Sequence, residues 1–441
     1  MASIQNDDER LLARIGYNQE LRREFNKWST VSYAISILGV LGSVPATFGS
    51  PITAGGPATA VWAWFVGSVM AMCIASSVAE LVSAYPTAGG MYFVTKHVVP
   101  PEHVAIWAWV IGWCNFLGQA AGVASLAYTI SQMIFAAAVM NSTAEDGSPT
   151  FTPAEWVFTE VTDGSGWGSK GFSFLLGFLS VAWTMTDYDG TTHMSEETHD
   201  AAIRGPVAIR SAILVSGLVG WMLTVTFCFC LTDYDGIVNS PTGLPVAQIF
   251  LNAGGKTGGT IMWFFVILVQ FFTGCSAMLA NARMCYAFAR DDALPFSSFW
   301  SNINKYTGTP VNAVWLVVVF CTCLDLIGIG STLTIVAIFN VCAPALDLSY
   351  VAVIVAHRVY EKRVRFIPGP YTMGIWSKPI NLVACSWVVF ISVILFFPTT
   401  KPVTPTNMNY AICVAGKYTG PRTKDIIDML PTDDPDDTDF P

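Results

Sequence analysis

Residues 31–50 read VSYAISILGVLGSVPATFGS, an uncharged apolar stretch that is long enough to cross a membrane as a helix. Within it, Gly39-Val40-Leu41-Gly42-Ser43 precedes Pro45, and two glycines with a proline favour unwinding of the backbone. Unwound backbone is tolerated in a bilayer only where it is buried or lines a cavity. Close packing of small residues against another helix would explain the glycines equally well. The sequence therefore predicts a spanning helix that is either interrupted or closely packed at 39–43.

Eight further apolar stretches follow, at 59–84, 104–139, 171–190, 209–231, 259–281, 311–330, 332–356 and 380–398. The stretch at 104–139 is too long for a perpendicular helix and too short for two, so we predict one tilted helix. The 441 residues are 53% hydrophobic and only 12% charged, about half the roughly 25% that is usual in soluble domains. These features predict an all-α polytopic membrane protein with about nine transmembrane helices.

The lysines and arginines are distributed unevenly between the two sides of these stretches. Sixteen of them lie in 1–30 and in the loops on the same side, against Lys170 and Lys256 in the opposite loops. Positive charge concentrates on the cytosolic side of membrane proteins, so residues 1–30 are predicted to be cytosolic. The sequon Asn141-Ser142-Thr143 then falls on the side of the membrane opposite the cytosol, where Asn141 is a candidate for glycosylation.

The fourth stretch ends in WTMTDYDG, residues 183–190, which places two carboxylates just past a run rich in Phe and Leu. A charge at membrane depth is costly and usually serves a function. The two aspartates would equally well cap the cytosolic end of a helix, because Glu196 and Glu197 follow and are expected near water. Asp325 and Asp347 stand among apolar neighbours as candidate proton or sodium sites, although Asp347 is also close to a helix break at Pro344.

Other function classes receive little support from the sequence. The formal net charge of −9 argues against a nucleic-acid partner. No G-x-S-x-G, H-E-x-x-H or P-loop pattern points to an enzyme. Two cysteine pairs have C-x-C spacing, at 228/230 and 321/323, but such neighbours point to different faces of a helix and do not form a metal clamp. We expect no metal and no cofactor, and the lipid bilayer as a partner.

Six strings along the chain carry a family likeness: AELVSAYPTAGGMY (79–92), WTMTDYDGTTHMSEE (183–197), RMCYAFARDDALP (283–295), TPVNAVW (309–315), FIPGPYTMG (366–374) and PTNMNYAICVAG (405–416). With them the chain resembles the fungal amino acid/choline permease family of the amino acid–polyamine–organocation superfamily, in particular its GABA-permease-like members. The resemblance implies a LeuT-like fold with two inverted five-helix repeats, in each of which the first helix is unwound at the membrane midplane. The two interrupted stretches, 31–50 and 171–190, occupy the corresponding places.

The resemblance also implies a substrate site between the two interrupted helices. Amides of the first helix would bind a substrate carboxylate at the positive end of a half-helix. Asp187 stands where the family usually has glycine, and with Trp183 or Tyr188 it would hold a cationic amine. The substrate-binding residues implied in this way are Gly39, Val40, Leu41, Gly42, Ser43, Trp183, Thr184, Thr186, Asp187 and Tyr188, with Trp113, Asn115 and Gln119 as further lining.

The chain also departs from the family pattern of twelve spans. It passes from TFTPAEW (150–156) directly to VFTEVTDGSGW (157–167), where the family continues into a fourth and a fifth helix. MNYAICVAG (408–416) likewise joins KYTGPRTKD (417–425) without a complete twelfth helix. We therefore predict a cytosolic segment 1–30, a transporter domain 31–398 and an acidic tail 399–441. The transporter domain would comprise an incomplete first repeat 31–139, an external loop 140–170, a second repeat 171–356 and an extra helix 380–398.

The function that the resemblance implies is secondary active transport of a small amine or amino acid, such as GABA or choline, by alternating access. We expect coupling to protons, with Asp187 as the first and Asp347 as the second candidate for ion coupling. The plasma membrane is the expected location, and the vacuolar membrane is the alternative. A different interpretation is a truncated isoform or an exon-deficient gene model that does not transport, because missing helices would remove part of the permeation path.

Overall fold

The computed structural model describes residues 8–13, 15–142, 151–330 and 332–402, without the side chains of 329–339. These residues form helices and loops, with one isolated β-bridge between Phe25 and Thr198. The elements are α2 (Lys27–Leu38), α3 (Val40–Thr47), α4 (Gly49–Ala84), α5 (Gly90–Thr95), α6 (Pro101–Ser142), α7 (Ala154–Thr159), α8 (Lys170–Leu176), α9 (Phe178–Thr184), α10 (Gly190–His193), η1 (Ser195–Glu197), α11 (Ala201–Phe229), α12 (Tyr234–Val238), α13 (Pro245–Arg290), α14 (Ser297–Trp300), α15 (Val311–Gly330), α16 (Thr332–Val359), η2 (Gly374–Trp376) and α17 (Ser377–Leu395). The tail from 403 onward lies outside the described residues.

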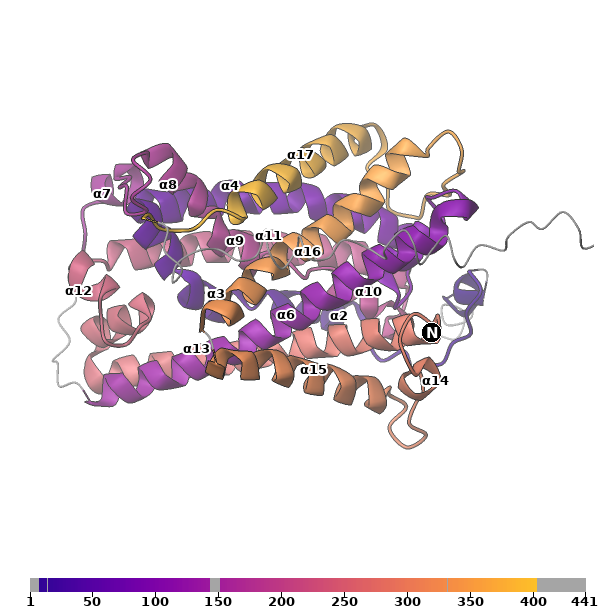
Figure 1. The fold of residues 1–441 in the computed structure, drawn as a ribbon, viewed down its shortest axis with the longest axis horizontal. Helices are drawn as coiled ribbons and strands as arrows, with labels where there is room; N and C mark the ends of the chain where they lie inside the picture. The colour runs from indigo at the N-terminus through magenta and orange to yellow at the C-terminus, as the bar shows by residue number, and fades with distance from the viewer. Residues whose placement is uncertain (1–7, 14, 143–150, 331, 403–441) are drawn as a thin grey trace, which may run out of the picture.

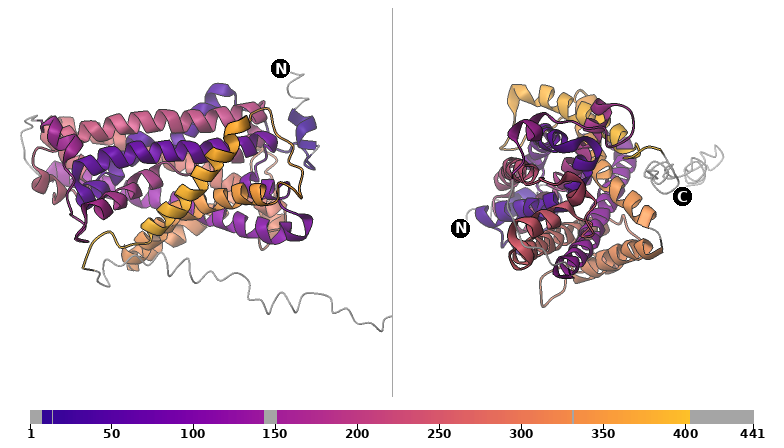
Figure 2. Two further views of the ribbon diagram at one scale, coloured as in Figure 1. Left: turned by 90° about the horizontal axis from the view of Figure 1, so that it is seen from above. Right: turned by 90° about the vertical axis from the view of Figure 1, so that its left-hand side faces the viewer.

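Eight helical segments of the described chain are long and apolar enough to cross a membrane. They run along the long axis of an elongated bundle (Figures 1 and 2). The all-α polytopic fold is thereby confirmed. The stretch 171–190, which was predicted to be an interrupted span, is divided among α8, α9 and α10 and is therefore not one of these eight segments.

The helix α6 confirms that the stretch 104–139 is one tilted helix. It has 42 residues, and at about 1.5 Å per residue it is far longer than a hydrocarbon layer of roughly 30 Å. Figure 1 shows it crossing the bundle obliquely. It packs along α13 on one side and along α16 and α15 on another, so it forms the central scaffold of the bundle.

Two of the other long helices bend sharply at a glycine with a positive φ. These are Gly56 in α4 (φ 81°), which is followed by Pro57, and Gly255 in α13 (φ 60°). A residue with a Cβ rarely adopts this backbone, and proline cannot donate the helical hydrogen bond, so the helix axis changes direction there. The predicted spans at 59–84 and 259–281 therefore begin just after a bend.

The first predicted interruption is shorter than the sequence suggested. Only Gly39 leaves the helical conformation (φ 47°, ψ 43°), whereas Val40–Thr47 forms α3. A Cβ on Gly39 would lie 1.7 Å from Oγ1 of Thr273, and one on Gly42 would lie 2.4 Å from Oε1 of Gln270. The expectation that the whole of 39–43 is unwound is therefore wrong. One glycine breaks the helix and both allow it to pack closely against α13.

Candidate functional site

The two interrupted helices meet at a small cavity of about 30 Å³ in the middle of the bundle. Residues of α2, α3, α6, α9, α13 and α16 line it, and the predicted residues among them are Ser43, Trp183, Thr184, Thr186 and Asp187. A cavity of this size holds one or two water molecules rather than an amino acid. In this conformation the cavity is therefore too small to hold an amino acid.

Asp187 is the most unusual residue of this cavity. It lies in the non-helical segment between α9 and α10 and has a positive φ of 60°, which is uncommon for a residue with a side chain. Its Oδ1 atom is buried and has no hydrogen-bond partner among the described residues. A buried carboxylate oxygen without a donor is costly unless a ligand or a proton satisfies it. The geometry is suited to binding a group that carries N–H donors and positive charge.

A second and larger cavity of about 270 Å³ adjoins the first toward the end of the bundle that is predicted to be external. Its lining is partly polar and includes Ser50, Thr129 and Gln132. The indole of Trp183 borders both cavities and donates a hydrogen bond from Nε1 to Oγ of Ser125 at 3.3 Å. Trp183 therefore separates the central cavity from an outer vestibule.

Between the central cavity and the end predicted to be cytosolic, Asp189 contacts a group of buried polar side chains. Its carboxylate accepts hydrogen bonds from Nδ2 of Asn115 at 2.9 Å and from the hydroxyl of Tyr350. Nε2 of His193 lies 3.6 Å from Oδ2 of Asp189, while Nδ1 is 2.7 Å from the carbonyl oxygen of Ala88 and must donate to it. Asn115, which was predicted to line the substrate site, instead positions Asp189.

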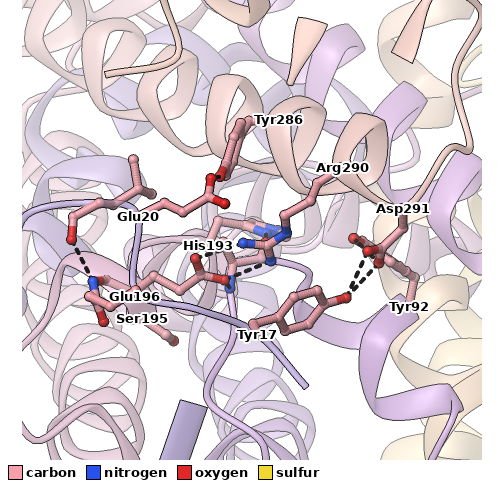
Figure 3. A network of polar contacts seen from close by, with 12 residues as sticks. Tyr17, Glu20, Tyr92, His193, Ser195, Glu196, Tyr286, Arg290 and Asp291 are labelled. Atoms are coloured by element: carbon pink, nitrogen blue, oxygen red, sulfur yellow. Dashed lines mark hydrogen bonds and ion pairs between the residues drawn. The ribbon is translucent and has the colours of Figure 1, made fainter. Parts of the chain in front are cut away.

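At the end predicted to be cytosolic, two acidic residues form buried ion pairs with α13, and Figure 3 shows the pair of Glu196 with Arg290. Arg290 donates two hydrogen bonds to Glu196, at 2.9 and 3.0 Å, and Nε of Arg283 lies 2.6 Å from Oε1 of Glu197. Glu196 is 0% and Glu197 9% exposed, so the expectation that both are near water is wrong. They are buried because arginines distant in the sequence neutralise them.

The N-terminal segment closes over these ion pairs (Figure 3). The hydroxyl of Tyr17 donates to both carboxylate oxygens of Asp291 at 2.8 Å, and Tyr92 donates to the same carboxylate at 3.1 Å. The guanidinium carbon of Arg290 lies 3.9 Å from the centre of the Tyr17 ring. Burial, followed by the negative charge of Asp291, raises the pKa of Tyr17, so its hydroxyl remains a donor. The sequence reasoning did not identify Tyr17, because the partners of this residue lie on other helices.

Several other predicted residues lie outside the central cavity. Trp113 packs against Phe116 and Phe288. Gln119 is buried, and both polar atoms of its amide lack a partner among the described residues. Leu41 is 48% exposed and points away from the site.

Tyr188 is fully buried and stacks near Tyr350, with 5.3 Å between the ring centres. Val40 is buried and near Gly220 of α11. Asn141 is exposed in the last turn of α6, at the end predicted to be external, whereas Thr143 of its sequon lies outside the described residues. The cavity also includes residues that the sequence reasoning missed, namely Gly122, Ser125, Thr273, Ala277 and Cys342. The small residues Gly118, Gly122 and Ser125, spaced at about one helical turn, were the available signal on α6.

Comparisons with known proteins agree with this architecture. A family model described as amino acid permease matches the chain in two overlapping pieces, residues 25–162 and 138–416. An uncharacterized amino-acid permease of Schizosaccharomyces pombe is 43% identical, covering 93% of this chain and 86% of the relative. Amino-acid permease 2 of Neurospora crassa is 34% identical (94% and 86%), and amino-acid permease BAT1 of Arabidopsis thaliana is 30% identical (92% and 91%).

The alignment with the Schizosaccharomyces relative spans 465 positions, whereas 93% of this chain is about 410 residues, so about 55 positions of the relative face gaps. The similarity nevertheless extends over nearly the whole chain and includes the segments that build the central cavity. The chain therefore belongs to the amino acid permease family, and it is a membrane transporter of amino acids rather than an enzyme.

Proposed function

We propose that this permease carries a small substrate with a cationic amine, such as GABA, choline or a related amino acid, by alternating access and with protons as the driving ion. The observation that carries the proposal is the buried Oδ1 of Asp187, which has no partner among the described residues and faces the cavity between the two helix breaks. The primary ammonium of GABA or another amino acid would supply both the positive charge and the N–H donors that this oxygen lacks, whereas the quaternary ammonium of choline would supply the charge alone. The plasma membrane is the proposed location.

The remaining groups of the cavity suit the other end of such a substrate. Helix α3 begins at Val40, and the amides of Val40 and Leu41 have no earlier carbonyl of this helix to bind, whereas those of Gly42 and Ser43 donate to the carbonyl oxygen of Gly39. Together with the positive end of the helix dipole, the amides of Val40 and Leu41 favour a carboxylate. Trp183, whose ring borders the cavity, would add a cation–π attraction for the amine. A substrate with a carboxylate and an amine would therefore be held between α3 and Asp187.

The two sides of the site support alternating access. The outer vestibule reaches Trp183, whereas the opposite end is closed by the Asp189 cluster and by the ion pairs of Glu196 and Glu197. We propose that this arrangement is the form closed toward the cytosol. Substrate release on that side would require Arg283 and Arg290 to separate from their partners.

Uptake into liposomes that contain the purified chain tests this proposal. The probes are radiolabelled GABA, choline, arginine and alanine, each supplied with an inward proton gradient. We expect uptake of at least one of the amines, and a loss of at least about tenfold in Asp187→Asn, equivalent to about 1.4 kcal/mol. Glu102→Gln is the control, because Glu102 is an exposed carboxylate in the first turn of α6 and lines neither cavity. Undiminished uptake by Asp187→Asn would remove Asp187 from amine binding.

One observation favours the second candidate, a truncated form that does not transport. The gap of about 55 alignment positions is close to the length of two spans of about 20 residues with a connection.

Sequencing the gene and its transcript across the junctions 156/157 and 416/417 tests the truncation directly. Coding sequence retained at either junction would show that the native protein has further helices. Restoring them and repeating the liposome assay would then separate the two candidates. Uptake by the extended chain alone would assign transport to the longer form, and equal uptake by both chains would overturn the truncation hypothesis.

A further inference from the structure

A second buried carboxylate faces a cavity of its own, on the opposite side of α9 from the substrate cavity. This cavity has a volume of about 20 Å³ and is enclosed by α4, α9, α16 and α17. Asp347 of α16 is the one ionisable side chain of this lining; Gly67 and Ile74 of α4 and the indole of Trp387 on α17 are among the others. The volume is sufficient for a single water molecule, which the carboxyl group could bind.

Asp347 has no protein partner among the described residues. Its side chain is only 8% exposed, and it forms no hydrogen bond or ion pair with any described residue. The titratable groups that interact with it electrostatically are Asp189, Tyr188 and Cys342, and the lining residues of α4, α9 and α17 add none. Since none of these groups is a cation, an ionised Asp347 would be unpaired at membrane depth. These surroundings therefore favour the protonated carboxyl in this conformation.

The same short segment separates this cavity from the substrate site. Val181, Ala182 and Met185 line the Asp347 cavity, whereas Trp183, Thr184 and Asp187 line the central one. The non-helical backbone that follows α9 begins at Met185, directly between the two cavities. A substrate that binds Asp187 and moves this segment would thus also change the surroundings of Asp347.

The wall of the Asp347 cavity consists of helices that pack closely enough to respond to such a movement. A Cβ on Gly67 of α4 would lie 2.4 Å from Cγ1 of Val181, so α4 and α9 are in direct contact at this level. Pro344 lies one turn before Asp347 in α16 and removes a helical hydrogen bond there. The helix that carries the carboxyl is therefore locally weakened beside the cavity.

We propose that Asp347 is the proton-carrying site of this transporter, separate from the substrate site and linked to it through the segment at Met185. The proposal rests on the proposed transport function. In the transport step, the carboxylate accepts one proton from water on the outer side and releases it to water on the cytosolic side, and no other bond changes. Asp187 would bind substrate and Asp347 the coupling proton, so the two functions are assigned to different carboxylates.

Gradient-driven accumulation in liposomes tests this assignment. With one proton moved per substrate, a gradient of one pH unit supports up to about tenfold accumulation of the GABA or choline probe. For Asp347→Asn, which resembles the neutral acid, we expect the accumulation ratio to fall to about one while exchange without a gradient continues. Glu102→Gln, at an exposed carboxylate that lines neither the central cavity nor the Asp347 cavity, should retain accumulation. Accumulation by Asp347→Asn equal to that of the unchanged chain would overturn the proposal.

The assay also separates this proposal from the proposed function. If the unchanged chain exchanges a probe but the pH gradient has no effect on its accumulation, proton coupling through Asp347 is overturned and the transport function stands. No movement of any probe by the unchanged chain would overturn the transport function, and with it the coupling.

An infrared measurement tests the protonation of Asp347 without any substrate. A neutral carboxylic acid has a carbonyl stretching band that a carboxylate lacks. The infrared difference spectrum between the unchanged chain and Asp347→Asn at neutral pH should contain this band. The difference spectrum between the unchanged chain and Asp187→Asn serves as the comparison. Absence of the band from the Asp347 difference spectrum would show that the carboxyl is ionised and would contradict the proposal, even in a variant that folds poorly.

Discussion

The charged residues at the centre of the bundle and those at its cytosolic end are both buried, but they are arranged differently. At the cytosolic end, Glu196 and Glu197 each pair with an arginine of α13. At the centre, no lysine or arginine among the described residues forms an ion pair with Asp187 or Asp347. Paired charges stabilise a closed conformation, whereas unpaired ones at membrane depth require a partner that arrives during transport.

Asp189, between the central cavity and the cytosolic ion pairs, illustrates this difference. Asp189 lies between the two regions and receives hydrogen bonds from Asn115 and Tyr350, with His193 close by. Its neighbours on either side in space, Asp187 and Glu196, show the two extremes of no partner and a bidentate arginine. The depth in the membrane thus does not by itself decide whether a carboxylate has a hydrogen-bond or ion-pair partner. The side chains of the helices that face the carboxylate decide it.

Loss of Arg290 should have the largest effect on stability. Arg290→Ala leaves Glu196 buried without its cation, and removing one partner of a buried pair costs about 3–5 kcal/mol. We expect a clear decrease in the midpoint of thermal unfolding, measured by tryptophan fluorescence in detergent. Arg365→Ala, a substitution at an exposed arginine, is the control. The double variant with Glu196→Gln should recover part of the loss, and an effect no larger than that of the control would show that the pair does not hold the cytosolic end closed.

Loss of the Tyr17 hydroxyl should have a smaller effect in the same region. Tyr17→Phe keeps the ring that Arg290 covers but removes the hydrogen bonds to Asp291, and a bond to a charged group contributes about 1.5–3 kcal/mol. Asp291 retains its bond from Tyr92, which limits the damage. The measurement is again thermal unfolding, together with the labelling rate of a cysteine introduced at the N-terminal segment. An unchanged labelling rate would show that the Tyr17 hydroxyl does not hold the N-terminal segment against this end of the bundle.

Neutralising a central carboxylate should leave stability nearly unchanged, in contrast to the cytosolic end. Asp187→Asn replaces a buried carboxyl whose Oδ1 has no partner to lose, so we expect a shift of unfolding free energy of less than about 1 kcal/mol, or a gain. Thermal unfolding measured beside the liposome assay tests this. A destabilisation as large as that of Arg290→Ala would mean that Asp187 is structurally paired, and the comparison between the two regions would fail.

The smallest effect concerns His97, a buried titratable group outside the spans. Its ring stacks on Tyr85 with 4.0 Å between the ring centres, and burial, followed by the charge of Lys96, lowers its pKa. The folded protein therefore favours the neutral ring, while the unfolded chain takes up a proton near its ordinary value of about 6.5. This contribution to stability is present above that pH and is lost as the pH falls below it. His97→Gln should reduce the pH dependence of thermal unfolding between about pH 7.5 and pH 5.5 slightly, and an unchanged profile would contradict the assignment.

Much of the fold could be predicted because it depends on local sequence. Hydropathy located the spans, and the length of 104–139 indicated the single oblique helix α6. Gly39 and the polar run WTMTDYDG at 183–190 marked both interruptions, since glycines and carboxylates beside an apolar stretch are local features of the sequence. The extent of the first interruption was overestimated, because Val40–Ser43 has enough helical hydrogen bonding to continue as α3 once one residue has turned.

The site was predicted less completely, for reasons of geometry between helices. Trp183, Thr184, Thr186 and Asp187 line the central cavity as expected, while Trp113 packs elsewhere and Asn115 supports Asp189. A position on a long helix is compatible with any rotation about the axis until the neighbouring helices are known. The lining contributed by α13 and α16 was missed for the same reason.

By itself, the sequence determined that this chain is a helical membrane protein, where two of its helices break, and which side carries the positive charge. These properties follow from hydropathy and backbone preference within some twenty neighbouring residues. Only the tertiary structure decided which acids are paired and which are not. Arg290 and Glu196 are 94 residues apart in the chain and share two hydrogen bonds, whereas Asp347 lies in an apolar cavity without a partner among the described residues. Coulombic pairing depends on distance in space, and that distance is set by how the helices pack.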